Sequence, residues 1–183
     1  RIMETGGTFL QGYNCQLAVD DAHQVIVAQA VTNQSPDAQH LRPMLDRIAA
    51  NCGAFPDRLT ADSGYWSEAN AAQCEARGVD AYLATERLKH GECPPASRGR
   101  TPKGLDAKGR MRRKLRTKAG RAIYARRKAV VEPVNGQIKE ARRFRRFLLR
   151  GLEPVRGELG LIATTHNLLK LFRSGWNPAA AMG

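Results

Sequence analysis

The chain has 183 residues, of which 42% are hydrophobic, and a formal net charge of +13. This length suits one domain with a substantial core, and the charge predicts a polyanionic partner. No apolar run is long enough to span a bilayer, no signal peptide is visible, and the four scattered cysteines match neither a zinc module nor a disulfide framework. We therefore expect a cytoplasmic protein without a membrane partner.

The positive charge is concentrated in one part of the chain. Residues 1–97 carry 7 Lys and Arg against 12 Asp and Glu, whereas residues 98–150 carry 20 against 3 and residues 151–183 carry 3 against 2. A mildly acidic part is thus followed by an intensely basic segment. This distribution argues against a uniformly basic, ribosomal type of protein and indicates a specialised surface for nucleic acid.

Two β-rich runs lie near the start of the chain. Residues 12–19 and 24–32 are joined by a short polar turn, which predicts a β-hairpin. A helix is expected to follow, with Ser35 as its N-cap, Pro36 in its first turn and Gly53 at its end. Its apolar stripe consists of Leu41, Met44, Leu45 and Ile48.

A strand–helix–strand unit comes next. Residues 58–61 form a short strand, Ser67 caps a helix over residues 68–77, and residues 79–84 form another strand. Two strands joined through a helix predict a right-handed parallel crossover. The order of the elements indicates an α/β fold in which helices pack on a mixed sheet.

Residues 89–121 differ in character from what precedes them. They are rich in Gly, Pro, Lys and Arg and nearly lack large apolar residues, which predicts a disordered or loosely helical linker that becomes ordered on nucleic acid. A last helix is expected over residues 154–172, with His166 and Asn167 as a hydrogen-bonded packing pair. The expected division is a partial catalytic core over 1–88, a basic linker over 89–121, C-terminal helices over 122–173 that complete the domain, and a frayed tail over 174–183.

The helix that contains Tyr124 has two contrasting faces. At 100° per residue, its apolar face holds Val130, Val134, Ile138 and Ala141. The opposite face holds Glu132, Gly136, Lys139 and Arg143. Two interpretations of this lone carboxylate remain open: an intrahelical ion pair on a solvated basic helix, or a metal ligand beside cations that bind a phosphate backbone.

Asp62 is the second carboxylate of interest. It follows the strand at residues 58–61, and open α/β sheets bind ligands beyond the carboxyl ends of their strands. Gly64 after it permits a tight turn, although an Asp in this position is often only a cap or turn residue. If Asp62 and Glu132 come together, they repel each other unless a divalent cation lies between them, and carboxylate oxygens suit Mg²⁺ or Mn²⁺. We therefore predict that both residues are ligands of one metal site.

Several short motifs occur in a fixed order. They are GYNCQ and AVD within residues 12–20, ADSGY at 61–65, a Tyr–Arg–Glu–Lys pattern over 124–139, and HNL at 166–168. In this order they resemble an insertion-sequence transposase of the DDE class. The resemblance implies an RNase H-like fold, a mixed sheet flanked by helices, and three acids that hold two metal ions. It also implies that double-stranded DNA is cut at the ends of the element and joined to a target.

The resemblance assigns roles to individual residues. Asp62 corresponds to the second acid and Glu132 to the third, so both are expected to be catalytic metal ligands. Tyr124, Arg127 and Lys139 correspond to a signature whose members contact DNA phosphates near the scissile bond. For Lys139 an ordinary exposed helix lysine remains the alternative.

The position of the signature arginine is less certain than that of the acids. Four residues separate Arg127 from Glu132, one more than in the usual pattern, so Arg126 or Lys128 is an alternative. A basic cluster beyond the helix is expected to hold DNA ends. Its members are Arg142, Arg143 and Arg146.

The first of the three acids has no counterpart in the sequence. The family places it in the first of three antiparallel strands, whereas only two strands are expected before residue 35. Asp20 and Asp21 fall in a turn and Asp37 falls at a helix start, so the first strand and its Asp are expected upstream of Arg1. We therefore expect this chain alone to be inactive, and the full-length protein to act as a homodimer on the bacterial nucleoid. A non-catalytic DNA-binding remnant and a metal-dependent nuclease of the same fold are the alternatives.

Overall fold

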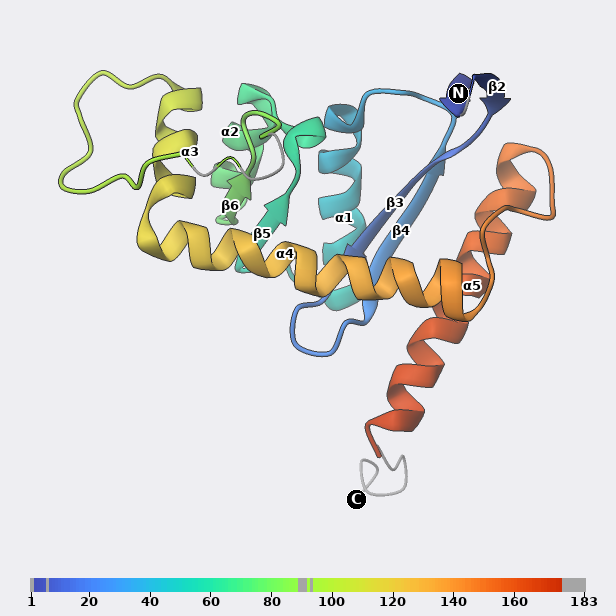
Figure 1. Cartoon of the computed structure of the whole chain (residues 1–183). Coiled ribbons are helices and arrows are strands. Elements are labelled where there is room, and N and C mark those ends of the chain that lie inside the picture. Colours follow the sequence, from blue (N-terminus) through green and yellow to red (C-terminus); the bar gives the residue numbers. More distant parts are fainter. Residues whose placement is uncertain (1, 6, 89–91, 93, 176–183) are drawn as a thin grey trace. The chain divides into compact units, whose positions relative to one another are not determined.

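A computed structural model describes residues 2–5, 7–88, 92 and 94–175. These residues form a mixed α/β fold of strands and helices (Figure 1). This fold class was predicted and is consistent with an RNase H-like domain. The chain divides into two compact units, one made of residues 1–35 and 130–183 and the other of residues 36–129. Within the described ranges, no helix is long and apolar enough to cross a membrane.

The first unit contains two antiparallel hairpins. The predicted hairpin is confirmed as β3 (Asn14–Val19) paired with β4 (Ile26–Thr32). A second hairpin, β1 (Ile2–Thr5) with β2 (Thr8–Gln11), precedes it, so the expectation of only two strands before residue 35 was wrong. The Gly–Gly sequence at residues 6 and 7, between these strands, is typical of a tight hairpin turn and is the sequence signal for this hairpin.

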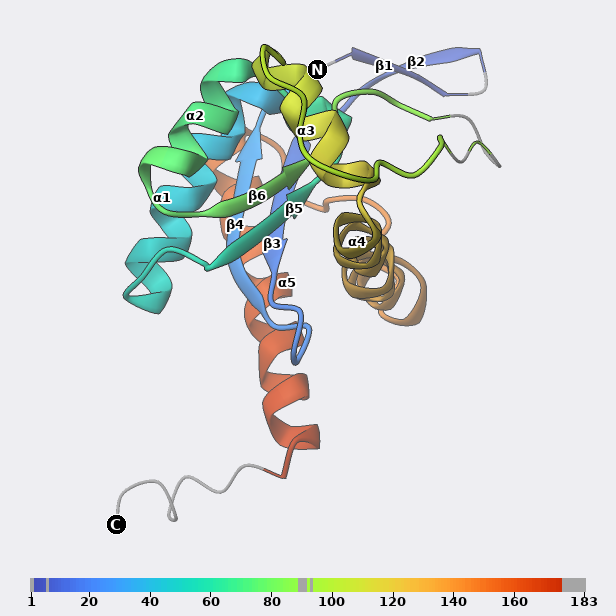
Figure 2. The same ribbon diagram turned by 90° about the vertical axis from the view of Figure 1, so that its left-hand side faces the viewer.

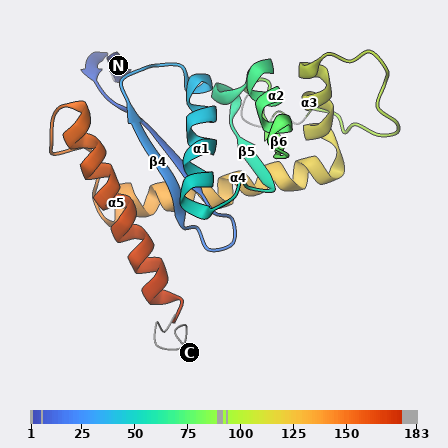
Figure 3. The same ribbon diagram turned by 180° about the vertical axis from the view of Figure 1, so that it is seen from behind.

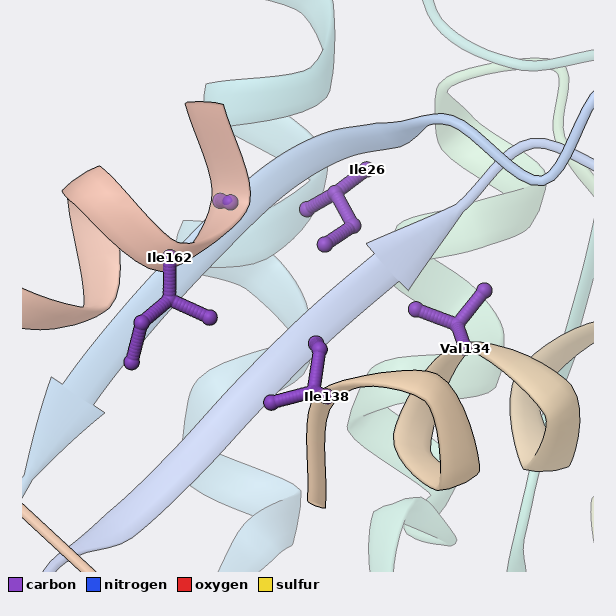
Figure 4. Close-up of a cluster of buried hydrophobic side chains, with 5 residues drawn as sticks. Ile26, Val134, Ile138 and Ile162 are labelled. Carbon is purple, nitrogen blue, oxygen red and sulfur yellow. The ribbon is translucent and has the colours of Figure 1, made fainter. Parts of the chain in front are cut away.

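Helix α5 (Leu152–Arg173) packs on β4, as Figure 3 shows from behind. Helix α4 (Lys118–Gly136) carries the unit boundary between Ala129 and Val130, and its last residues pack in the same core. Figure 4 shows the centre of this core. The buried side chains of the cluster are Ile26, Val134, Ile138, Ile162 and Ala163.

The predicted apolar stripe of α4 holds for Val130, Val134 and Ile138, which are buried, but not for Ala141, which is exposed. The helix widens into a π-helical turn, η3 (Gln137–Ala141). Its hydrogen bonds join residue i to i+5, so each residue there advances by less than 100° and the stripe leaves the core. The constant 100° period used for the prediction therefore fails at this turn.

The turn between β3 and β4 is fastened to α5 by side chains. His166 is fully buried and its Nε2 lies 2.9 Å from the Gln24 carbonyl oxygen. The Asn167 side chain accepts from the Ile26 N–H and donates to the Ile26 carbonyl, both at 2.8 Å. Gln24 has a φ of +58°, and Lys170 donates to its side-chain oxygen at 2.8 Å. The predicted packing role of His166 and Asn167 is confirmed.

In the second unit, β5 (Arg58–Ala61) and β6 (Asp80–Leu83) form the predicted parallel pair. They are joined through α2 (Glu68–Ala76), which Ser67 caps by accepting from the Asn70 N–H at 3.0 Å. Figure 2 shows α2 and α3 (Ala107–Arg116) beside β6, and both helices contact that strand. The described part of the expected linker over 89–121 therefore contains a regular helix.

Helix α1 (Leu41–Cys52) has the predicted buried stripe and ends at Gly53, whose φ is +79°. Its start differs from the prediction. A 3₁₀ turn, η1 (Asp37–His40), precedes it, Pro36 is the N-cap of that turn, and no side chain caps it. The Ser35 cap was therefore wrong. Residues 89–91, 93 and 176–183 of the expected linker and tail lie outside the described residues.

Candidate metal and nucleic-acid site

Asp62 lies where the strand β5 ends. It is the N-cap of a 3₁₀ turn, η2 (Ser63–Tyr65), and its Oδ1 accepts from the Gly64 N–H at 3.0 Å. The carboxylate is exposed. One oxygen is thus fixed by the backbone, and the other has no such bond to this turn. A cap and a metal ligand are compatible roles here, because a carboxylate has several lone pairs.

A second carboxylate stands beside this turn. A Cβ placed on Gly64 would lie 2.8 Å from Asp37 Oδ2 and 3.2 Å from Asp62 Oδ1, so both carboxylates approach the same glycine. Gly64 is absent from the residues with positive φ, so its backbone is one that other residues adopt. The glycine leaves room for these two carboxylates, and the turn that we expected to require it has a backbone that other residues adopt. Asp37, which we interpreted as a helix-start residue, lies in this neighbourhood.

Asn70 connects the two 3₁₀ turns that carry these carboxylates. It lies on α2 and is 7% exposed. Its side-chain amide donates to the Ala38 carbonyl in η1 and to the Tyr65 carbonyl in η2, both at 2.8 Å. Asn70 therefore sets the spacing of Asp37 and Asp62 through the backbone of the turns that carry them.

The charge of Asp62 acts on the pKa of two tyrosines. Burial raises the pKa of Tyr65, and the charges of Asp37 and Asp62 raise it further. Burial also raises the pKa of Tyr124, on α4, where the charge and hydrogen bond of Arg127 oppose the shift and the charge of Asp62 adds to it. Both phenols therefore remain protonated at neutral pH and can donate to an anion. Asp62 and Tyr124, far apart in sequence, therefore lie close enough in this unit for the charge of Asp62 to act on the phenol.

Arg127 is the best placed of the three candidates for the signature arginine. Its guanidinium lies 5.4 Å from the centre of the Tyr124 ring, a cation–π distance. Arg127 is half-buried, and its Nε is buried without a hydrogen bond among the described residues. Arg126 and Lys128 are exposed. The geometry favours Arg127 as the member of this pattern that stays with Tyr124.

Glu132 and Lys139 belong to the other unit. Both are exposed, as a residue that meets a metal or a phosphate must be. Lys139 lies near β3, since burial raises the pKa of the Cys15 thiol and the charge of Lys139 partly counteracts it. Within the described ranges, no group of three His, Cys, Asp or Glu side chains is placed to hold a metal.

The basic cluster after η3 contains residues of two kinds. Arg142 donates to the Ile162 carbonyl at 3.1 Å, hydrogen-bonds to Thr165 and lies 5.0 Å from the Phe144 ring centre. It therefore ties the end of η3 to α5. Arg143, with a φ of +61°, and Arg146 are exposed, and their side chains make no hydrogen bond or ion pair in the part of the chain that the structure describes.

Several cationic side chains of α3 form ion pairs or hydrogen bonds within the protein. Arg112 and Arg116 form ion pairs with Glu86 at 3.1 and 3.3 Å. Lys114 pairs with Asp80 and lies 4.2 Å from the Tyr82 ring centre. One terminal nitrogen of Arg113 lies within hydrogen-bonding distance of three consecutive carbonyl oxygens of the preceding loop. These belong to Arg98, Gly99 and Arg100, at 2.9, 2.6 and 3.0 Å.

Sequence reasoning missed two contributors to the Asp62 site. The first contributor is Asn70. It is buried on the same face of α2 as Cys74, four residues later, and a polar residue on a buried stripe is a signal that the sequence offers. For Asp37 the sequence offers no such signal. Its approach to Gly64 depends on how η1 and η2 pack.

The comparisons with known proteins identify the family of the chain. No curated protein and no solved structure matches the chain. Residues 2–168 match the family described as "Transposase DDE domain". This match covers most of the chain and includes Asp62, Tyr124, Glu132 and Lys139. The chain belongs to the transposase DDE-domain family.

Proposed function

We propose that this chain is part of a transposase catalytic domain that cuts DNA at the ends of an insertion sequence and joins them to a target. Asp62 and Glu132 are two of its three metal-binding acids. The observation that carries the proposal is the Asp62 site. A strand-end carboxylate is fixed by the Gly64 amide, and the signature residue Tyr124 lies within its electrostatic reach.

The donor set of this site fits a hard divalent cation. Asp62 and Glu132 are exposed carboxylates, and Asp37 supplies further negative charge beside Asp62. Mg²⁺ prefers such oxygen ligands and is bound through one or two carboxylates, and Mn²⁺ accepts the same ligands. When bound, such ions stabilise the attacking and leaving oxygens of an in-line displacement at phosphorus.

The chain's own cations and phenols bind and orient the DNA in this proposal. Tyr124 stays protonated and donates to a phosphate oxygen, and Arg127 beside it supplies charge. Lys139 meets a phosphate near Glu132. Arg143 and Arg146 hold the DNA beyond the reacting bond, whereas Arg142 positions the end of η3 and meets DNA only secondarily.

Plasmid cleavage tests the proposal. Supercoiled plasmid carrying the element's ends is incubated with Mg²⁺ or Mn²⁺ and a protein extended upstream through the first acid. We expect nicking and joining, and a loss of at least about 1,000-fold in Asp62→Asn and in Glu132→Gln, because a ligand of this kind is worth several kcal/mol in the transition state. Glu140→Gln is the matched control, since Glu140 is exposed and pairs with Arg145.

The same assay separates the alternatives. We expect the present chain to bind the plasmid, and cleavage by this chain would show that the third acid lies within residues 1–183. Cleavage without joining would indicate a nuclease. Full activity in Asp62→Asn or Glu132→Gln would refute the assignment of the acids, and binding without cleavage by the extended protein would indicate a non-catalytic remnant.

A further inference from the structure

The segment between η3 and α5 presents two leucines to solvent. Leu148 is 80% exposed and Leu149 is 50% exposed, and Figure 1 shows the segment in orange, leading into α5. The two phenylalanines of the same segment, Phe144 and Phe147, are partly buried and pack on the hydrophobic clusters of this unit. The segment therefore has its own apolar contacts with the core, and the two leucines lie outside them.

The backbone that carries the leucines is fixed from the inside. The carboxylate of Glu158, on α5, accepts from the backbone N–H groups of both leucines at 2.9 to 3.1 Å. Beyond them the Gly151 N–H donates to the Tyr13 hydroxyl at 2.9 Å. The Tyr13 ring in turn lies edge-to-face with Phe147, with 6.1 Å between the ring centres. A side chain on a backbone held in this way is already ordered before it meets a partner, which lowers the entropic cost of binding.

Free cations flank the leucines on both sides. Residues 141–152 contain five arginines and no Asp or Glu. Of these, Arg146 and Arg150 are exposed, and their side chains make no hydrogen bond or ion pair with any residue that the structure describes. An apolar protein surface would leave both charges without partners, whereas a DNA duplex carries phosphates on either side of its stacked bases. The charge around the leucines therefore favours DNA as the partner.

We propose that Leu148 is a wedge that enters a DNA duplex between two adjacent base pairs, while Arg146 and Arg150 bind the phosphates beside the opened step. Apolar side chains that enter from the minor groove partly unstack one base step and kink the duplex. Pyrimidine–purine steps such as TA are the favoured sites, because they unstack most readily. The inference rests on the proposed function only in taking DNA as the partner, and it adds a contact that distorts the duplex.

Binding to duplexes that differ at one base pair tests the wedge. The wild-type chain is titrated, without metal, into a fully paired duplex and into the same duplex with a single central mismatch, and binding is followed by fluorescence anisotropy. We expect the mismatched duplex to bind about 10-fold more tightly, because a mismatch has already lost part of the stacking that a wedge must break. A third duplex carries 2-aminopurine beside a TA step, and its emission, which stacking quenches, should rise on binding.

Variants distinguish a wedge from an electrostatic contact. Leu148→Ala is expected to lose the preference for the mismatch and the 2-aminopurine signal, but to keep the salt dependence of binding and the unfolding temperature, since it removes no charge and no buried contact. Leu148→Met keeps a wedge and should keep the preference. Arg150→Ala should do the converse of Leu148→Ala, with a weaker salt dependence and an unchanged preference. Leu161→Ala is the matched control, because Leu161 is 70% exposed in the same unit but lies on α5.

Three results would overturn the proposal. They are equal affinity of the wild-type chain for the paired and mismatched duplexes, a preference that survives in Leu148→Ala, and a preference that is lost equally in Leu161→Ala. None of these measurements involves metal or strand cleavage, so the wedge can fail while the proposed function stands. A chain that binds neither duplex would contradict both.

Discussion

Two basic regions of the chain look alike in sequence and differ in use. On helix α3, ion pairs with carboxylates are formed by Arg112, Lys114 and Arg116. The Arg113 guanidinium bonds to carbonyl groups of the loop before the helix. Arg146, in the segment after η3, is exposed and makes no hydrogen bond or ion pair with any residue that the structure describes. The net charge of a segment therefore does not measure what it offers to DNA.

The difference has a physical cause. The loop before α3 exposes carbonyl groups, the start of β6 supplies Asp80, and the segment after β6 supplies Glu86, so the α3 cations find acceptors within their own unit. The carboxylate near the second region is Glu140, which pairs with Arg145. Cations on α3 are thus expected to stabilise the fold, and the exposed cations after η3 to bind phosphate.

Gly120 allows the start of α4 to pack closely against the end of α3. Its replacement has the largest expected effect on the free energy of unfolding. A Cβ there would lie 2.0 Å from the Lys114 carbonyl oxygen, which is backbone and cannot move aside. Gly120→Ala is expected to destabilise the unit by about 3 kcal/mol or more in thermal and urea unfolding. Gly136→Ala is the control in the same helix, because nothing lies within 4 Å, and it is expected to be neutral or slightly stabilising. Equal stability of the two variants would show that α3 is not held as described.

Arg113→Ala tests whether the α3 charge is structural. Three carbonyls lose their donor, and we expect a loss of about 1.5–3 kcal/mol in the free energy of unfolding. The affinity of the folded Arg113→Ala variant for DNA should differ little from that of the wild type. Lys108→Ala, on the exposed side of α3, is the control and should leave stability unchanged. If Arg113→Ala weakens DNA binding without loss of stability, the contrast between the two regions fails.

Arg146→Ala tests the other region. We expect unchanged stability, a roughly uniform loss of DNA affinity across sequences, and a decrease of about 1 in the slope of log affinity against log salt. Arg142→Ala sharpens the result within the same cluster. It removes donors to Ile162 and Thr165, so it should lower the unfolding temperature as well. Fluorescence anisotropy over a salt series, with unfolding curves for each variant, measures both effects.

The smallest expected effect concerns pH. Burial acts to raise the pKa of Asp80, but the hydrogen bond and charge of Lys114, aided by Tyr82 and Arg58, hold the pKa below its ordinary value of 3.8. Because the folded-state pKa is depressed, this stabilisation is complete above pH 3.8 and is lost as the pH falls through the folded-state value. Asp80 is largely exposed, so we expect about 0.2–1 kcal/mol. Asp80→Asn should flatten the acid limb of the stability curve, and an unchanged acid limb would contradict the pairing.

Local signals predicted the elements that local physics determines. The Ser67 cap, the left-handed Gly53 and the stripe from Leu41 to Ile48 depend on neighbours within a few residues, and all three are confirmed. The hairpin β3–β4 and the parallel pair β5–β6 follow from the same kind of pattern. The acids Asp62 and Glu132 came from motif spacing, and their shared metal stays a prediction.

Contacts between distant segments could not be predicted in this way. Asn70 bonds to Ala38, 32 positions before it, and so joins η1 to η2, and a Cβ on Gly64 would crowd the carboxylate of Asp37. The exposure of Ala141 follows from a π-helical turn, which no 100° wheel contains. The cations of α3 bond to acceptors on Asp80, Glu86 and residues 98–100, and these contacts are not evident from the composition of residues 89–121.

We propose that Asp62 and Glu132, which belong to different units, bind one divalent cation. Iron-directed cleavage of the polypeptide tests it directly: Fe²⁺ replaces Mg²⁺, ascorbate and peroxide generate radicals at the ion, and the fragments are located by mass spectrometry. We expect cuts beside residue 62 and beside residue 132, and the loss of both cuts in Asp62→Asn and also in Glu132→Gln. A cut beside one residue that persists when the other is replaced would contradict it.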